Sequence, residues 1–329
     1  MTVRADVSAI DLAPLDRTTD PSPGRHHVVG DFRLFIRRTG AGDAGAEQPV
    51  DGPPAGARPG GIAVYVHGLG GSSLNWTDLG QILDPVLDGH ALDLPGFGYS
   101  DPAPGGDYSL RTHVRAVIGY LETLPQPVHL IGNSLGGIVC ARVAQERPEL
   151  VRTLTLISPA FPDMRPRLRR LSFVPLGLVK IPQAGPAVFR LLGGARPDLQ
   201  VAHTLRQIMV SPERLGRVRT DQTVGHAVDR AGMKWAAQAL ASSFTELVGS
   251  WAWRGGADHW TRARQITVPT LVVWGSRDLL VSAEIAPKVV RIIPHARLVM
   301  FSDAGHVSQM EMPADTAVEI CRHIGIQLR

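Results

Sequence analysis

The sequence is poor in several kinds of residue, and each shortage excludes a class of protein. Of its 329 residues only Cys140 and Cys321 are cysteines, so no disulfide framework is expected and both should be buried, reduced thiols. No apolar run approaches the ~20 residues that a membrane-spanning helix needs. Charged residues interrupt the first 20 residues, which therefore lack the apolar core of a signal peptide. These absences predict a soluble, cytoplasmic protein.

Lysine is scarce as well, and no recognised nucleic-acid-binding motif is present. The lysines are Lys180, Lys234 and Lys288, so arginine supplies nearly all the positive charge behind the formal net charge of +4. Abundant arginine, glycine and proline are typical of a GC-rich genome, which accounts for the basic balance without a nucleic-acid partner. His, Cys and carboxylate residues do not cluster at metal-ligand spacings. We therefore expect no nucleic acid, no metal and no cofactor.

The sequence does contain a long alternation of short apolar segments with amphipathic ones. The apolar segments are rich in β-branched residues, as in strands buried on both faces of a parallel sheet, and the amphipathic ones fit crossover helices. A hairpin over residues 27–38 precedes them. The alternation predicts an α/β fold with a mostly parallel, doubly wound sheet. The predicted strands are 62–66, 90–94, 128–131, 154–157, 271–274 and 297–301, and the predicted helices include 109–124, 136–146 and 282–292.

The alternation stops between about Pro159 and Arg264. Helical segments occur there without a convincing strand, which predicts an inserted helical cap, or lid. Residues 1–25 are polar and contain proline, so they are predicted to form a flexible arm. The predicted organisation is an arm at 1–25, an α/β core at 26–158 and 265–329, and a cap at 159–264. The helical segments of the cap are 186–192, 199–209 and 233–248.

The strongest chemical signal is Gly132-Asn133-Ser134-Leu135-Gly136, which lies between a predicted strand and a predicted helix. A serine nucleophile needs such a sharp turn, because the turn directs its hydroxyl away from the sheet. Gly132 and Gly136 leave room where a side chain would clash. In this strand–turn–helix context we predict that Ser134 is a catalytic nucleophile rather than part of a structural turn.

A second signal, His67-Gly68-Leu69-Gly70-Gly71, directly follows the predicted strand at 62–66. In acyl transfer such a loop supplies one of two backbone N–H groups that hold the oxyanion, and the residue after the nucleophile supplies the other. We therefore predict that the Leu69 and Leu135 amides form an oxyanion hole. A phosphate-binding loop is the alternative, but the spacings of a P-loop and of a dinucleotide site are absent.

A serine hydroxyl needs a general base, and the sequence offers 12 histidines. His306 is the candidate because it lies in a loop just past an apolar strand. Asp278 is predicted to orient His306, since it also follows an apolar strand. Asp303 is the competitor, but a carboxylate three residues before the base would rarely reach the far nitrogen of the ring.

The order Ser, Asp, His along the chain resembles that of the α/β-hydrolase superfamily and differs from the orders of chymotrypsin-like and subtilisin-like proteases. The resemblance runs from about residue 26 to the C-terminus, and it implies that the helical insertion caps the active site. The motifs that carry it are His67-Gly68, Asp93-Leu94-Pro95-Gly96-Phe97-Gly98-Tyr99-Ser100, Gly132-Asn133-Ser134-Leu135-Gly136-Gly137, Trp274-Gly275-Ser276-Arg277-Asp278 and Gly305-His306.

Within this superfamily, a serine nucleophile argues against dehalogenases and epoxide hydrolases, which use aspartate. Our first prediction is cleavage of a small or lipid-like carboxylic ester. The alternative is hydrolysis of a C–C bond in ring-fission products, because Asn133 and Asn75-Trp76 look similar to residues of those enzymes. We predict that these three residues bind substrate. The lack of a Gly-Pro-Gly run in the oxyanion loop, and Val307 where those hydrolases carry tryptophan, depart from their pattern.

Other outcomes stay open at this point. Thioesterase, perhydrolase and acyltransferase chemistry use the same residues, and a ligand-binding member of the fold without turnover is a further alternative.

The predicted cap holds four of the six tryptophans, and Trp253 is predicted to contact a small ester or lipid substrate. Arg165, Arg167, Arg169 and Arg170 adjoin an apolar run. The simpler interpretation is that these four arginines form a solvated face. The alternative is that they and the apolar run make transient contact with an anionic membrane surface.

Overall fold

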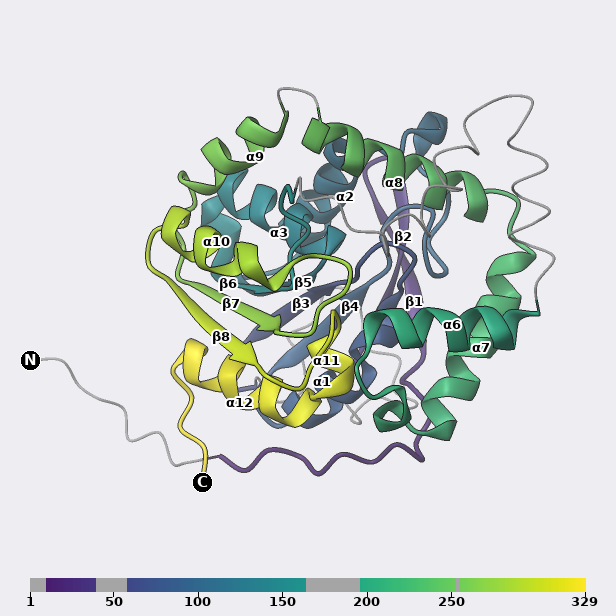
Figure 1. Ribbon diagram of the computed structural model, residues 1–329, viewed down its shortest axis with the longest axis horizontal. Helices are drawn as coiled ribbons and strands as arrows, with labels where there is room; N and C mark the ends of the chain where they lie inside the picture. The colour runs from purple at the N-terminus through teal and green to yellow at the C-terminus, as the bar shows by residue number, and fades with distance from the viewer. Residues whose placement is uncertain (1–9, 40–57, 164–195, 253–254) are drawn as a thin grey trace, which may run out of the picture.

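The computed structural model describes residues 10–39, 58–163, 196–252 and 255–329 (Figure 1). Its centre is an eight-stranded sheet in the order β1-β2-β4-β3-β5-β6-β7-β8. β1 and β2 form an antiparallel hairpin that pairs antiparallel with β4, and all other neighbouring strands are parallel. The strands are β1 (Gly24–Val29), β2 (Phe32–Arg38), β3 (Ile62–Val66), β4 (Asp88–Leu92), β5 (Val128–Asn133), β6 (Val151–Ile157), β7 (Thr270–Gly275) and β8 (Ala296–Phe301).

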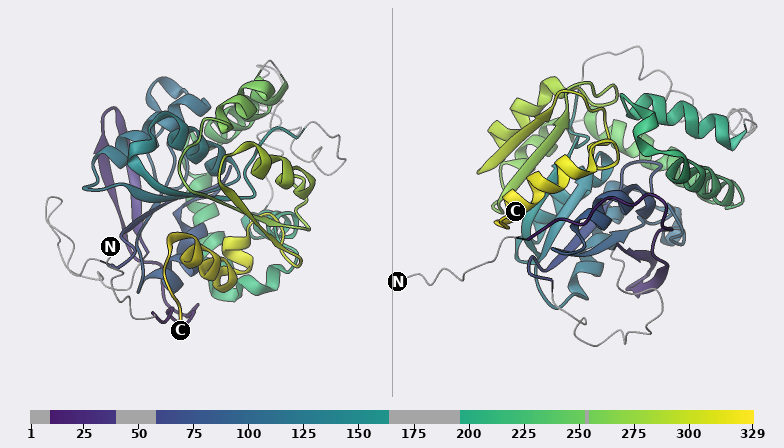
Figure 2. Two further views of the ribbon diagram at one scale, coloured as in Figure 1. Left: turned by 90° about the vertical axis from the view of Figure 1, so that its left-hand side faces the viewer. Right: turned by 90° about the horizontal axis from the view of Figure 1, so that it is seen from below.

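Helices cover both faces of this sheet (Figure 2). Side chains alternate between the two faces of a strand, so each central strand contributes to two hydrophobic layers. In β3, Val64 and Val66 pack in the layer of α2, α3 and α10, whereas Ala63 and Tyr65 pack in the layer of α1 and α12. The bounds are α1 (Thr77–Leu83), α2 (Leu110–Glu122), α3 (Leu135–Glu146), α10 (Ala286–Ile292) and α12 (Pro313–Ile324).

The observed sheet confirms the predicted α/β fold class. Every predicted strand is present, with ends that differ by a few residues. β4 lies two residues earlier than predicted, at 88–92 instead of 90–94, and so ends at Leu92. Asp93 leaves the strand, and its side chain accepts hydrogen bonds from the backbone N–H groups of Ser73 and Tyr99.

Between β6 and β7, the described residues form helices and no strand. These are α6 (Pro197–Ile208), α7 (Arg217–Ala231), α8 (Ala236–Ala252) and α9 (Gly255–Ala263), which we refer to as the α6–α9 segment. α6 and α7 pack against each other at one side of the molecule, and α8 crosses above α2 (Figure 1). The predicted helix at 186–192, the four arginines between 165 and 170, and Trp253 lie outside the described residues. None of the described helices is long and apolar enough to cross a membrane.

Residues 10–23, within the predicted arm, run along the edge of the core from the C-terminus towards α7 (Figure 1). Ile10 forms a β-bridge with Leu328, and Leu12 and Leu15 pack on the layer of α1 and α12. Arg17 then pairs with Asp78 of α1, with 2.7 Å between Nε and Oδ2. Arg219 of α7 donates to the Thr19 carbonyl at 2.7 Å, so this stretch of chain contacts both the core and the α6–α9 segment.

Candidate active site

Ser134 lies at a sharp turn between β5 and α3. Its backbone has φ 55° and ψ −115°, a conformation that costs a non-glycine residue of the order of 1–3 kcal/mol. The turn is tight because glycine allows it: a Cβ on Gly132 would lie 2.4 Å from the Gly136 carbonyl oxygen, and one on Gly136 would lie 2.2 Å from that of Val66. The Ser134 N–H donates to the Ile157 carbonyl at 3.0 Å, which anchors the turn to β6.

His306 and Asp278 meet at the carboxyl ends of β7 and β8. His306 Nδ1 lies 2.8 Å from Asp278 Oδ2, and both side chains are buried. Asp278 Oδ1 accepts hydrogen bonds from the backbone N–H groups of Leu280 and Val281, at 2.8 and 3.0 Å. These bonds fix the carboxylate, so the proton of the neutral imidazole sits on Nδ1 and Nε2 is left able to accept one.

The competing carboxylate, Asp303, is engaged elsewhere. It forms ion pairs with Arg214 of the α6–α9 segment and with Arg277, and about half of its side chain is exposed. The structure therefore brings Asp278, and not Asp303, to the His306 ring.

Asn133 joins the turn of Ser134 to the loop of His306. Its Nδ2 donates to the carbonyl oxygens of Ile157, at 3.1 Å, and of His306, at 3.0 Å. Asn133 is buried, and both amide hydrogens have backbone acceptors. The sequence prediction gave this residue a contact with substrate, which stays a prediction; in the structure Asn133 holds two loops together.

The loop after β3 lies against the Ser134 turn. A Cβ on Gly68 would lie 3.1 Å from the Ser134 Cβ, so the approach is close. Leu69 is half-buried, and Leu135, the first residue of α3, is buried. The predicted oxyanion hole thus joins two segments that are in contact, and the role of their amides stays a prediction.

His67 holds this loop through hydrogen bonds at both nitrogens of its ring. The Leu94 N–H donates to His67 Nε2 at 3.0 Å, so Nδ1 carries the ring proton and donates to the Gly68 carbonyl at 2.7 Å. Burial lowers the pKa of His67 to about 3. His67 is therefore a neutral, structural residue. Asp93, which holds the Ser73 N–H further along the same loop, has its pKa raised to about 6, also by burial.

Asn75 and Trp76 take different positions. Asn75 Oδ1 accepts a hydrogen bond from the Ser72 N–H at 3.0 Å, and its Nδ2 lies 3.4 Å from Met310 Sδ. Trp76 is fully buried and stacks on Tyr65, with ring centroids 5.2 Å apart. The contacts of both residues with substrate stay predictions.

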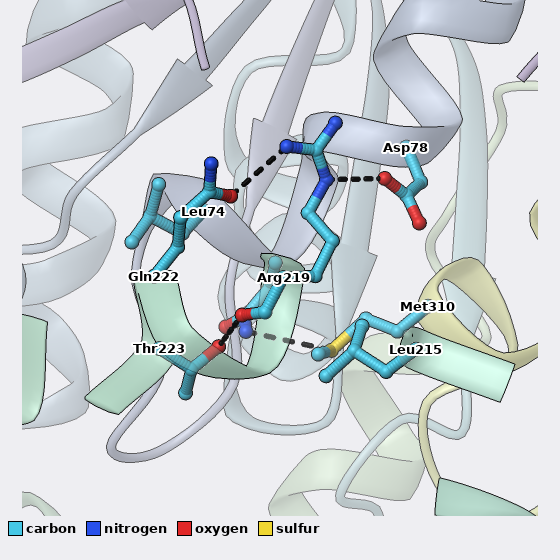
Figure 3. A pocket seen from close by; sticks show the side chains of 8 residues that line it. Leu74, Asp78, Leu215, Arg219, Gln222, Thr223 and Met310 are labelled. Carbon is cyan, nitrogen blue, oxygen red and sulfur yellow. Dashed lines mark hydrogen bonds and ion pairs between the residues drawn. The ribbon is translucent and has the colours of Figure 1, made fainter. Parts of the chain in front are cut away.

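Asn75 also lines a pocket between the core and the α6–α9 segment (Figure 3). In this pocket the buried Arg219 of α7 pairs with the buried Asp78 of α1, with 2.7 Å between Nε and Oδ1. Sequence reasoning missed this pair, because its members are 141 positions apart. The pocket is lined by Leu74, Asn75, Asp78, Leu215, Arg219, Gln222, Thr223 and Met310.

A serine at a strand–helix turn, and a buried His–Asp pair on loops after two later strands, define a protein of the α/β-hydrolase type. The chain belongs to the alpha/beta hydrolase fold family, whose model matches residues 64–313. It is an α/β hydrolase.

Individual relatives are distant. The chain is 26% identical over 321 residues to the 2-hydroxy-6-oxononadienedioate/2-hydroxy-6-oxononatrienedioate hydrolase of Cupriavidus pinatubonensis, covering 94% of this chain and 95% of that protein. It is 26% identical over 264 residues to Lipase 1 of Psychrobacter immobilis, covering 77% and 74%. The fold is similar to that of the enol-lactonase from Burkholderia xenovorans LB400, with a TM-score of 0.68, 19% identity, and 92% and 100% of the two chains covered.

Proposed function

We propose that the chain is a serine hydrolase that cleaves a small or lipid-like carboxylic ester through Ser134, His306 and Asp278. The observation that carries this proposal is the 2.8 Å contact between His306 Nδ1 and Asp278 Oδ2. It leaves Nε2 of the same ring as the proton acceptor. Asn133 ties the backbone of His306 to the turn that presents Ser134.

In the proposed mechanism, His306 Nε2 takes the proton of Ser134 Oγ as that oxygen attacks the ester carbonyl. The Leu69 and Leu135 amides receive the oxyanion of the tetrahedral intermediate. His306 then gives its proton to the leaving alcohol, and Ser134 remains acylated. A water molecule, deprotonated by His306, attacks the acyl-enzyme, which releases the carboxylic acid and restores Ser134.

The α6–α9 segment is proposed to be the cap over this site. Support comes from direct contact with the loop of His306, where the His306 N–H donates to the carbonyl oxygen of Ile208 at 2.7 Å. The two positions lie at the end of α6 and just after β8. A segment in contact with the base can also shape the space that a substrate occupies.

A C–C bond hydrolase is the second candidate. Its support is the Cupriavidus pinatubonensis relative, which matches 94% of the chain, against 77% for the lipase. Ester cleavage is favoured because Val307 stands where the C–C hydrolases carry tryptophan. Rates on p-nitrophenyl esters of graded acyl length and on a ring-fission dienone would separate the two. Turnover of the dienone alone would overturn the ester assignment.

The nucleophile is tested with a fluorophosphonate probe, which labels only an activated serine. We expect the wild-type chain to be labelled and Ser134→Ala to be unlabelled. Ser158→Ala is the matched control, because Ser158 is a buried serine that also has a positive φ, 43°. Labelling that persists in Ser134→Ala would exclude Ser134 as the nucleophile.

A further inference from the structure

Glu311 links the loop of His306 to the α6–α9 segment. It ends the short helix α11 (Ser308–Glu311) and is only 3% exposed. Its Oε2 accepts a hydrogen bond from the Gly305 N–H at 2.8 Å, and its Oε1 accepts one from the Ser211 N–H at 2.7 Å. One carboxylate therefore joins the residue before the proposed base to a residue just past α6.

The same two segments meet at a second point. The His306 N–H donates to the Ile208 carbonyl at 2.7 Å, and a Cβ on Gly305 would lie 2.5 Å from that carbonyl oxygen. On its other side, the His306 carbonyl accepts from Asn133 Nδ2 at 3.0 Å. The backbone of His306 is therefore held between the core and the end of α6.

The chemical character of Glu311 is unusual for a residue that only fills space. Among the described residues it has two backbone amide partners and no ion-pair partner. A carboxylate that is buried without a cation is costly unless hydrogen bonds to its oxygens compensate, and bonds from N–H groups to a charged acceptor are stronger than neutral ones. Both oxygens of Glu311 are used in this way, one on each of the two segments that meet at the base.

We infer that Glu311 is a positioning residue for His306, and that through it the docking of the α6–α9 segment sets the place of the base. The inference rests on the proposed role of His306. With the end of α6 docked, Glu311 holds the Gly305 backbone while His306 Nδ1 meets Asp278, which leaves Nε2 as the proposed acceptor of the Ser134 proton. If the end of α6 moved away, Glu311 would lose the Ser211 N–H and His306 would lose the Ile208 carbonyl, so the loop of the base would be held by fewer bonds.

Glu311→Gln is the decisive variant. It conserves the size of the side chain, yet it turns one acceptor oxygen into an N–H donor that faces a backbone N–H, so one of the two links is lost. Glu319→Gln is the control on α12, because its side chain is 13% exposed and its carboxylate pairs with Arg297 and Arg322. Glu311→Asp keeps the charge but is one methylene shorter, and it serves as the second variant.

We expect Glu311→Gln to lower kcat on a p-nitrophenyl ester roughly tenfold to a hundredfold, since a small misplacement of a catalytic group costs about that much, with KM changed by less than about twofold. The rate of fluorophosphonate labelling should fall by a similar factor. The kcat and KM of Glu319→Gln should match those of the wild type. Hydrogen exchange at the amides of Ser211, Gly305 and His306 should become faster together in Glu311→Gln.

Two results would overturn the inference. One is a kcat for folded Glu311→Gln within about threefold of the wild type, and the other is an equal loss in Glu319→Gln. If Glu311→Gln does not fold, Glu311→Asp must show the same loss of kcat at constant KM, and wild-type kinetics in that variant would count against the inference. Absence of labelling in the wild type would instead refute the proposed function. Hydrogen exchange at the amides of Ser211, Gly305 and His306 would then still test whether Glu311 links the two segments.

Discussion

The hydrogen bonds of individual histidines indicate which ring nitrogen carries the proton, which the sequence leaves open. His306 is one of 12 histidines, and it is distinguished in the structure by the Asp278 carboxylate on Nδ1. His67 also carries its ring proton on Nδ1, but its Nε2 already accepts the Leu94 N–H. Nε2 is therefore occupied in His67, whereas in His306 it is the proposed proton acceptor.

Asp278→Asn tests the proposed role of Asp278 in orienting His306. The introduced amide would present an N–H to His306 Nδ1 and favour the wrong tautomer, so we expect kcat to fall by about 10⁴ with the fold intact. The measurement is kcat on an ester together with the circular dichroism spectrum. Asp303→Asn is the control and should stay within about threefold of the wild type. A similar fall in Asp303→Asn would contradict the assignment of Asp278.

Replacement of His67 by alanine tests its structural role. The change leaves the Leu94 N–H and the Gly68 carbonyl unpaired in a buried place, which we expect to lower the free energy of unfolding by about 2–5 kcal/mol. Urea denaturation would measure this. His203→Ala, at an exposed position of α6, should change the value by less than about 0.5 kcal/mol. Equal, small effects of the two variants would refute the structural role.

Whole strands and helices were predictable where local pattern decides them. β3 has the predicted bounds, and the Gly30-Asp31 turn between β1 and β2 has the positive φ that glycine favours, 55° at Gly30. The end of β4 was predicted two residues too late, because the apolar pattern does not register that the Asp93 side chain takes two loop amides. The packing of α7 on the core could not be predicted from the sequence either, since it depends on an ion pair with α1, a helix far away in the chain.

The ion pair between α1 and α7 yields a prediction about these two helices. Arg219→Met leaves Asp78 buried without one of its two cations, and removal of one partner of a buried pair costs about 3–5 kcal/mol. Asp78→Leu combined with Arg219→Met should recover much of that loss. Urea denaturation of both single variants and of the double variant would show it. Arg217→Met, which removes the partner of an exposed pair on the same helix, should have little effect. Purely additive effects would refute the coupling.

At the scale of the molecule, the sequence predicts the positions of the three proposed catalytic residues at strand ends, but not the contacts that support their loops. Ser134, Asp278 and His306 follow strands, and strand ends can be read from apolar runs. Glu311 was missed, although an acidic residue between Met310 and Met312 is a local signal of a buried charge. Its partner amide at Ser211 belongs to a segment whose docking no periodicity reveals. Contacts of this kind depend on the finished tertiary structure.

The buried histidines predict how the stability of the whole molecule depends on pH. Burial lowers the pKa of His67 to about 3 and those of His113, His129, His226 and His259 to about 4. These side chains are neutral in both states at a pH well above their ordinary pKa of about 6.5. As the pH falls below that value the unfolded chain binds protons that the folded chain does not, so stability is lost, by up to about 1.4 kcal/mol per pH unit for each histidine.

Asp93 acts in the opposite direction. Its pKa is raised to about 6 in the folded state, so between about pH 6 and 4 it binds a proton that the unfolded chain releases. The effect of this one carboxyl group on the free energy of unfolding cancels that of only one of the histidines. We therefore expect the free energy of unfolding to fall steadily from about pH 6.5 to about pH 4.5. Urea denaturation across that range would measure the slope. His226→Gln should reduce the slope by about one proton and His203→Gln should not, whereas a flat profile would contradict the prediction.

The path of residues 10–23 has a consequence for recombination between members of this family. Arg219 of α7 donates to the carbonyl oxygens of Thr19, at 2.7 Å, and of Asp16, at 3.3 Å, so two stretches about 200 positions apart form one joint. A chimera that imported α6–α9 alone would set a foreign helix against the native residues 10–23 and lose the fit between that guanidinium and its two carbonyls. We therefore expect a chimera to fold well only if residues 10–23 and the α6–α9 segment come from the same parent.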